Sequence, residues 1–190
     1  MSDLTMELTV QTLTTSEAFE KVRELAREIW PPTFSSILSD AQIEYMLDMM
    51  YAPEVFLEEQ ARGIIWELIL NADGQAIGYV SWDCNANDAG KLHEIYLRLQ
   101  YHGLGLGSKI LQYVKNRCRQ LGCQTLQLNV NKQNWKAIRS YRKNGFQIIE
   151  SATNDIGNDF VMDDFIMRCD LTCEQQIPRG INPSKQQPET

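Results

Sequence analysis

Residues 96–109 have the sequence YLRLQYHGLGLGSK, in which Gly103, Gly105 and Gly107 separate a strand-like segment from a helical one. Glycine has no side chain, so the backbone N–H groups of such a loop can turn toward a bound group. The helix that follows adds free N-terminal amides and the positive end of its dipole. The stretch therefore predicts a strand, a phosphate-binding loop and a helix in succession; the alternative is a tight strand-to-helix turn that binds nothing.

Two common phosphate loops do not fit this stretch. The dinucleotide-binding fingerprint needs a third glycine three positions after the second, but that place holds Ser108 counted from Gly103 and Ile110 counted from Gly105. A P-loop needs a lysine directly after a glycine, and no glycine of the cluster has one. Both signatures are excluded.

The flanking sequence predicts alternating helices and strands. Apolar periodicity and turn residues indicate strands at 6–13, 64–70, 76–83, 92–99, 125–130, 146–152 and 160–169. Helices are expected at 16–30, from Ser39-Asp40 onward, in a short stretch after Pro53, and at 106–121 and 134–143. Pro31-Pro32 is expected to break the first of these helices. The order indicates a mixed α/β chain with one sheet flanked by helices.

Length and composition favour one globular domain. The chain has 190 residues, 43% hydrophobic and 23% charged, which suits a single domain at 1–173. Residues 174–190 are polar and contain three prolines, and we expect them to form a mobile tail. No apolar run has the length of a membrane helix, and the first residues lack a signal-peptide layout, so we expect a cytoplasmic protein without membrane partners.

Charge and cysteine content narrow the classes of partner. With 25 acidic and 18 basic side chains the net charge is −7, which disfavours nucleic acid as a partner and suits a cationic substrate, or serves solubility alone. The five cysteines are odd in number and, with two histidines, form no metal-site spacing. We expect no metal and reduced, structural thiols.

The segment from Leu92 to Ser108 resembles the acetyl-CoA-binding motif of the GNAT superfamily of N-acetyltransferases, Arg/Gln-x-x-Gly-x-Gly/Ala. Two frames match: Gln100-x-x-Gly103-x-Gly105, and His102-x-x-Gly105-x-Gly107. The second is preferred because it puts the last glycine just ahead of the helix. Its departure is His102 in the Arg/Gln place, which we expect to be tolerated because that position contributes largely through its backbone.

A second segment, NWKAIRSYRKNGF at 134–146, is similar to the same superfamily's Asn-x-x-Ala-x-x-x-Tyr-x-x-x-Gly-Phe signature. Two motifs in the right order, separated by a helix and a strand, carry more weight than either alone. Residues 5–172 as a whole resemble, less specifically, a bacterial subgroup related to the PaiA-type polyamine acetyltransferases.

The resemblance implies a GNAT-like acyl-CoA N-acyltransferase fold, an α/β fold with a mixed, mostly antiparallel, splayed sheet flanked by helices. It implies acetyl-CoA as co-substrate, bound between the strands at 92–99 and 125–130. The cofactor-binding residues would be Leu97, Arg98, Leu99, His102, Gly103, Leu104, Gly105, Leu106, Gly107, Ser108, Asn134 and Tyr141.

Acetyl transfer from a thioester to an amine needs a neutral amine, a polarised carbonyl and a proton for the leaving thiolate. By resemblance Tyr141 is the general acid, and the Leu97 N–H polarises the carbonyl. Glu94 and His93 are candidate bases; strand alternation puts them on opposite faces, with Glu94 on the face of Leu92 and Tyr96. Water is the third candidate. The structural alternatives are a core tyrosine, an ion-paired Glu94 and Asn134 as a helix N-cap.

The function implied is an N-acetyltransferase that moves an acetyl group to a primary amine by direct attack in a ternary complex. A polyamine acetyltransferase is the subclass alternative, and a non-catalytic acyl-CoA-binding or regulatory module is the alternative of another class. A homodimer is kept as an option. Acidic side chains that would attract a polyamine if several lined one cleft, and are otherwise a solvated surface, are Asp40, Glu44, Asp48, Glu54, Glu58, Glu59, Asp155, Asp159, Asp163 and Asp164.

Overall fold

The computed structural model describes residues 7–86, 88–172 and 181–183. The helices are α1 (Ser16–Phe34), α2 (Asp40–Met50), α3 (Pro53–Ala61), α4 (Leu106–Gln120) and α5 (Trp135–Lys143), with a 3₁₀ turn at Leu99–Tyr101. The strands are β1 (Leu8–Thr12), β2 (Ile65–Leu70), β3 (Ala76–Ala86), β4 (Ala89–Leu97), β5 (Thr125–Asn131), β6 (Gln147–Gly157), β7 (Phe160–Asp170) and β8 (Ile181–Pro183).

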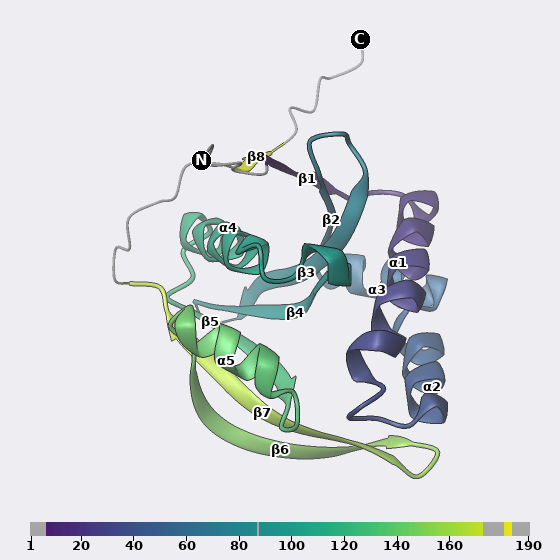
Figure 1. Ribbon diagram of the computed structural model, residues 1–190. Helices are drawn as coiled ribbons and strands as arrows, with labels where there is room; N and C mark the ends of the chain where they lie inside the picture. Colours follow the sequence, from purple (N-terminus) through teal and green to yellow (C-terminus); the bar gives the residue numbers. More distant parts are fainter. Residues whose placement is uncertain (1–6, 87, 173–180, 184–190) are drawn as a thin grey trace.

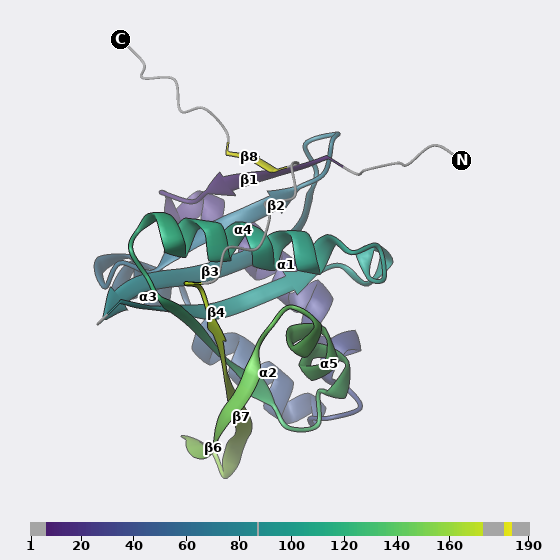
Figure 2. The ribbon, with the colours of Figure 1, turned by 90° about the vertical axis from the view of Figure 1, so that its left-hand side faces the viewer.

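The strands form one mixed sheet in the order β6-β7-β5-β4-β3-β2-β1-β8 (Figure 1). Only the β4–β5 and β1–β8 pairs are parallel; the other neighbours are antiparallel. Helices α4 and α5 pack on one face and α1, α2 and α3 on the other (Figure 2). The expected mixed, mostly antiparallel sheet flanked by helices is confirmed.

The sheet splays between its two central strands. Strands β4 and β5 pair only from Ala89 to Leu92 on one side and from Thr125 to Leu128 on the other. Beyond this point β4 continues to Leu97 and β5 to Asn131 without pairing with each other. Both strands therefore present unshared backbone N–H and C=O groups to the gap, as the resemblance implied.

The expected break at Pro31-Pro32 is wrong, because α1 continues to Phe34. The two prolines remove the hydrogen bonds that the carbonyls of Arg27 and Glu28 would accept. Arg27 and Glu28 are exposed, so water can take the place of the missing donors. On the inner side Trp30 and Phe34 are buried in the core and hold the last turn in place.

Strand β4 contains a bulge that strand alternation alone did not predict. Ser81 of β3 pairs with Glu94, while the next residue, Trp82, pairs with Leu92, so His93 is the extra residue. Glu94 therefore shares its face with Tyr96 but not with Leu92, which packs in the core on the α4 side. The expectation that Leu92 and Glu94 share a face is wrong for this reason.

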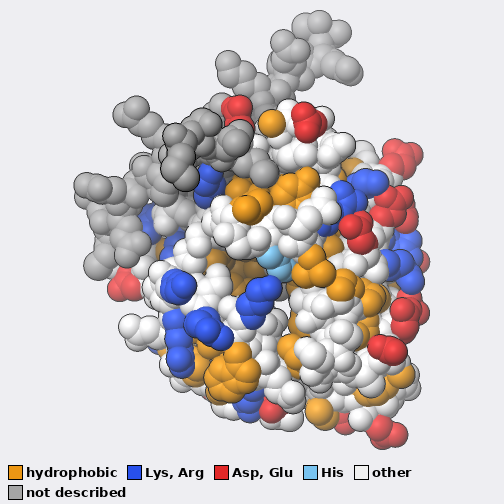
Figure 3. Space-filling model, viewed as in Figure 1, with side chains coloured by type: hydrophobic (Ala, Val, Ile, Leu, Met, Phe, Trp, Pro, Cys, Tyr) orange, Lys and Arg blue, Asp and Glu red, His pale blue; other side chains and the backbone are white. Residues whose placement is uncertain are grey.

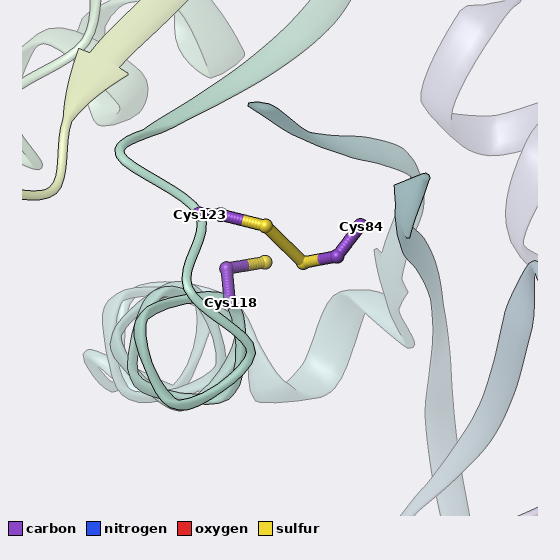
Figure 4. Close-up of side chains that lie close together, drawn as sticks. All are labelled: Cys84, Cys118 and Cys123. Atoms are coloured by element: carbon purple, nitrogen blue, oxygen red, sulfur yellow. A yellow bond between two sulfur atoms is a disulfide. The ribbon is translucent and has the colours of Figure 1, made fainter. Parts of the chain in front are cut away.

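The expectation of reduced thiols is wrong for two cysteines. Cys84, after the buried part of β3, forms a disulfide with Cys123 in the α4–β5 loop, across a Cα–Cα distance of 6.4 Å (Figure 4). The Cys118 thiol of α4 points at the same place, and the three sulfur atoms lie within 4.8 Å of one another. Two of the three sulfurs are bonded to each other, so they offer no thiolate to a metal ion.

The expected tail falls mostly outside the described residues. Within it, Ile181–Pro183 forms a parallel strand next to β1. Among the described residues, no helix is both long enough and apolar enough to span a membrane.

Candidate active site

A cleft of about 740 Å³ opens where β4 and β5 diverge. Its walls come from the glycine loop and the start of α4, from α5, and from α1 and α2 on the far side. In Figure 3 Lys and Arg side chains gather on the α5 side of this face, whereas Asp and Glu gather over α1 and α2. The basic side of this face is suited to phosphate groups. The acidic side chains over α1 and α2 lie outside the cleft, where several pair with Arg or Lys.

The glycine loop forms the expected cradle. Gly103 and Gly105 have φ of 78° and 76°, in the left-handed region, and Gly105 is the N-cap of α4. A Cβ at Gly103, Gly105 or Gly107 would meet no protein atom within 4 Å, so the space in front of this backbone is open. Gly103, Gly105, Leu106, Gly107 and Ser108 all line the cleft. These residues fit a pyrophosphate group bound by backbone amides at a helix N-terminus.

His102 lines the cleft, and its Nε2 donates to the backbone carbonyl of Leu97 over 2.8 Å. Its side chain thus holds the end of β4 instead of extending toward the cradle. Arg98 turns away: its guanidinium binds Glu28 of α1 and the Ala76 carbonyl. Arg98, Leu99 and Leu104 are not among the lining residues, and the Leu99 and Leu104 side chains are 47% and 54% exposed.

Helix α5 brings Asn134 and Tyr141 to the cleft. Asn134 is the N-cap, since its Oδ1 accepts from the Ala137 N–H over 3.1 Å. Its amide NH₂ group remains available to donate to a ligand. The Tyr141 ring packs edge-on against Phe146, 5.8 Å between centroids. Burial and the charge of Glu94 raise the pKa of Tyr141, so its hydroxyl stays protonated and can act as a proton donor.

Glu94 lies on the cleft floor with its side chain almost wholly buried, 7% exposed. Tyr51, the C-cap of α2, donates to Glu94 over 3.3 Å and is 2.7 Å from the Tyr79 hydroxyl, which in turn accepts from Trp30 over 3.1 Å. Burial first, and the charge of Glu59 second, raise the pKa of Glu94 to about 8. A carboxyl with this pKa can exchange a proton with an amine near neutral pH.

His93, the extra residue of the bulge, also lines the cleft. The His93 ring is committed elsewhere, because its Nε2 donates to Asp83 over 2.6 Å. Glu94 is therefore the better placed of the two to meet an amine.

Sequence reasoning missed the residues that surround Glu94. Tyr51, Tyr79 and Trp30 come from three different elements, and no spacing along the chain connects them. Of the acidic residues proposed to attract a cation, only Asp164 of β7 lines the cleft. It is buried, which raises its pKa. The other acidic residues of that set do not line the cleft; Asp48 and Glu44, for example, pair with Arg27 at the surface.

Comparison with known proteins agrees with the geometry. The model of the acetyltransferase (GNAT) family matches residues 19–146, about two thirds of the chain. The chain belongs to this family. It is 30% identical over 151 residues to a spermidine N(1)-acetyltransferase of Thermoplasma acidophilum, covering 77% of this chain and 91% of the relative.

Solved structures extend the likeness to three dimensions. The PaiA N-acetyltransferase of Thermoplasma acidophilum in complex with coenzyme A superposes with a TM-score of 0.73 at 26% identity, covering 87% of this chain and 99% of that one. The ribosomal-protein-S18-alanine N-acetyltransferase of Escherichia coli, at 18% identity and a TM-score of 0.65 over 89% of this chain and 97% of its own, shares the fold. The GNAT fold, acetyl-CoA as co-substrate and N-acetyltransferase activity, each expected from the two motifs, are confirmed.

Proposed function

We propose that this N-acetyltransferase transfers the acetyl group directly to a primary amine while both substrates occupy the cleft. Glu94 accepts the amine proton, Tyr141 protonates the departing coenzyme A sulfur, and the Leu97 N–H polarises the thioester carbonyl. The observation that carries this proposal is that a buried carboxyl of raised pKa and a protonated tyrosine line the same cleft. Each has the protonation behaviour that its role requires.

We propose that acetyl-CoA is held by the backbone of the loop from His102 to Ser108, with the Asn134 amide on its extended arm. The open space at the three glycines and the unpaired edges of β4 and β5 support this placement. Arg98, Leu99 and Leu104 remain predicted cofactor-binding residues, and contact through the backbone is what we propose for them, because they do not line the cleft.

The acceptor we propose is an aliphatic amine, with a polyamine as the subclass. The far side of the cleft combines apolar side chains, Met46 and Met50 among them, with the buried carboxyls of Glu94 and Asp164. A methylene chain that carries two or more amino groups would match both features. The Thermoplasma relative is named for spermidine acetylation, which favours the same class.

A panel of amines tests the proposal: spermidine, spermine, putrescine, a simple alkylamine, an amino sugar and a peptide with a free N-terminus, each with acetyl-CoA and a free-thiol readout. We expect thiol release with the polyamines, and a lower rate in Asp164→Asn with KM for acetyl-CoA unchanged. Asp163→Asn, which changes the neighbouring carboxyl that pairs with Lys132 outside the cleft, is the control. Thiol release with none of the amines, while acetyl-CoA still raises the melting temperature, would instead support the non-catalytic acyl-CoA-binding module.

We further propose a single acetyltransferase domain at 1–173, a cytoplasmic location and no nucleic-acid partner; the net charge of −7 supports the last of these. A homodimer stays an option that light scattering of the purified chain decides.

A further inference from the structure

The buried carboxyl of Glu94 must lose the proton it takes from the amine before the next turnover. When acetyl-CoA and an acceptor fill the cleft, the side of Glu94 that faces the cleft is closed to bulk water. A second route for this proton must therefore run through the residues behind Glu94, on the side away from the cleft.

A row of three residues crosses the sheet at this point. Trp66 of β2 pairs with Ser81 of β3, and Ser81 pairs with Glu94 of β4. All three side chains lie on the face covered by α1, α2 and α3. Trp66 belongs to the core on that face, Ser81 is two residues from Tyr79 of the same core, and Glu94 is two residues from Tyr96, which packs against it. Glu59 of α3 closes the row, since its Oε2 accepts from the Trp66 indole N–H over 2.8 Å.

Ser81 is the unusual member of this row. Its side chain is fully buried, and its Oγ has no hydrogen-bond partner among the described residues. A buried hydroxyl without a partner is destabilising, so it favours a proton donor or acceptor arriving from a neighbour. Neighbouring strands lie roughly 4.8 Å apart, so the two strand spacings between Glu94 and Trp66 amount to about 10 Å, which is too far for a direct hydrogen bond. Ser81 lies in between.

Glu59 connects the row to solvent. It is half-buried, next to the exposed Glu58 on the same helix, and neither Glu59 nor Ser81 lines the cleft. Burial raises the pKa of Glu59, while the Trp66 hydrogen bond and the nearby His93, Arg62 and Lys91 oppose the shift. The titratable groups that act on Glu94 are Glu59 from α3, Tyr51 from the end of α2, and Tyr96 and Lys91 from β4; Glu94 in turn acts on Tyr79 and Tyr141.

We propose that Ser81 and Glu59 form the outlet through which the proton taken up by Glu94 reaches solvent. The inference rests on the proposed function, in which Glu94 is the base. In the step itself the amine N–H bond breaks and a Glu94 O–H bond forms. That proton then passes through the Ser81 hydroxyl, with a water molecule bridging the gaps because the Oγ is bonded to neither carboxyl, to the Glu59 carboxylate and from there to solvent. Glu94 is left as the carboxylate, and Ser81 keeps one proton throughout.

The test compares Ser81→Ala, Glu59→Gln and Glu59→Asp with the control Glu58→Gln, which removes the same charge from the same helix outside the row. With spermidine as acceptor we expect kcat to fall about tenfold in Ser81→Ala and Glu59→Gln, less than the ~10²-fold loss of a direct acid or base. KM for acetyl-CoA should not change, the solvent deuterium isotope effect on kcat should rise, and Glu59→Asp should recover most of the rate.

A purely structural role would lower the melting temperature without changing the isotope effect. Wild-type kcat and isotope effect in folded Ser81→Ala or Glu59→Gln, or an equal loss in Glu58→Gln, overturns the outlet. If Ser81→Ala does not fold, the pair Glu59→Gln and Glu59→Asp decides.

A second measurement needs no acceptor and so separates this inference from the proposed function. The melting temperature of the wild type should fall as pH rises toward about 8, where Glu94 ionises. In Glu59→Gln this fall should move to lower pH, because the charge that raises the Glu94 pKa is gone. If the melting temperature of Glu59→Gln falls over the same pH range as that of the wild type, the two carboxyls are not electrostatically coupled. This result overturns the outlet, even if the enzyme acetylates amines. Absence of turnover in the wild type with every amine of the panel refutes the proposed function instead.

Discussion

Tyr141 and Glu94 illustrate how burial assigns opposite roles to two residues of one cleft. Burial raises the pKa of both side chains. For a tyrosine this keeps the proton on at neutral pH, which suits an acid; for a carboxyl it brings the pKa to about 8, close to the range where amines lose their protons. The same desolvation therefore produces a donor and an acceptor.

Replacing Tyr141 by Phe removes the proposed proton donor and little else, because the ring and its contact with Phe146 are kept. We expect kcat to fall by about 10²-fold or more, with acetyl-CoA binding by calorimetry unchanged. Tyr113→Phe is the matched control: its hydroxyl bonds Glu67 outside the cleft, so it should cost stability without lowering the rate. An unchanged rate in Tyr141→Phe means that another group is the acid.

Glu94 predicts a specific pH dependence. As a base it must be ionised, so kcat/KM should rise with pH through about 8 and level off above it. The free energy of unfolding should instead fall as pH rises. The folded-state pKa is raised above the ordinary value of 4.5, so stability is fully present below pH about 4.5 and declines until pH about 8. Glu94→Gln should lose about 10²-fold in rate. It should also be more stable than the wild type at pH 9, which melting curves at several pH values measure; a variant that melts below the wild type at pH 9 contradicts the raised pKa of Glu94.

At the scale of elements, the N-terminus of α4 can be tested separately from its stability. Gly105 and Gly122 lie just before and just after this helix, both with positive φ, and a Cβ at either meets no protein atom within 4 Å. Alanine at each should therefore cost a similar amount, about 1 kcal/mol of unfolding free energy. Only Gly105 lies at the cleft, so only Gly105→Ala should also weaken acetyl-CoA binding, by calorimetry at equal folded fraction. Equal affinities in the two variants would place the pyrophosphate elsewhere.

The elements also show what could be predicted from the sequence. The glycine loop and the N-cap Asn134 are local signals within one segment, and each was found at its expected position. The features that were missed depend on contacts between segments. The continuation of α1 through Pro31-Pro32 relies on the burial of Trp30 and Phe34, and the bulge at His93 is defined by pairing with β3. The periodicity of a single helix or strand contains no information on such contacts with other segments.

Over the whole molecule, the two sides of the sheet contribute different parts of the cleft. The α4 and α5 side provides the phosphate cradle and the basic surface, while the α1 to α3 side surrounds Glu94 with aromatic side chains and hydroxyls. The splay between β4 and β5 lets a ligand contact both sides at once. The Cys84–Cys123 disulfide ties β3 to the α4–β5 loop on the closed side of this splay, where β4 and β5 still pair.

This cross-link closes a loop of 39 residues, which corresponds to about 4 kcal/mol of stabilisation from the lost entropy of the unfolded chain. Reductant should therefore lower the melting temperature of the wild type. Cys118 is close enough to replace a lost partner, so the informative variant is the double change Cys84→Ser with Cys118→Ser, which leaves Cys123 alone in the cluster. It should melt at the temperature of the reduced wild type with or without reductant, whereas Cys118→Ser alone should keep the dependence. A wild type that melts identically under both conditions has no such cross-link in solution, and the central strands are then held by packing alone.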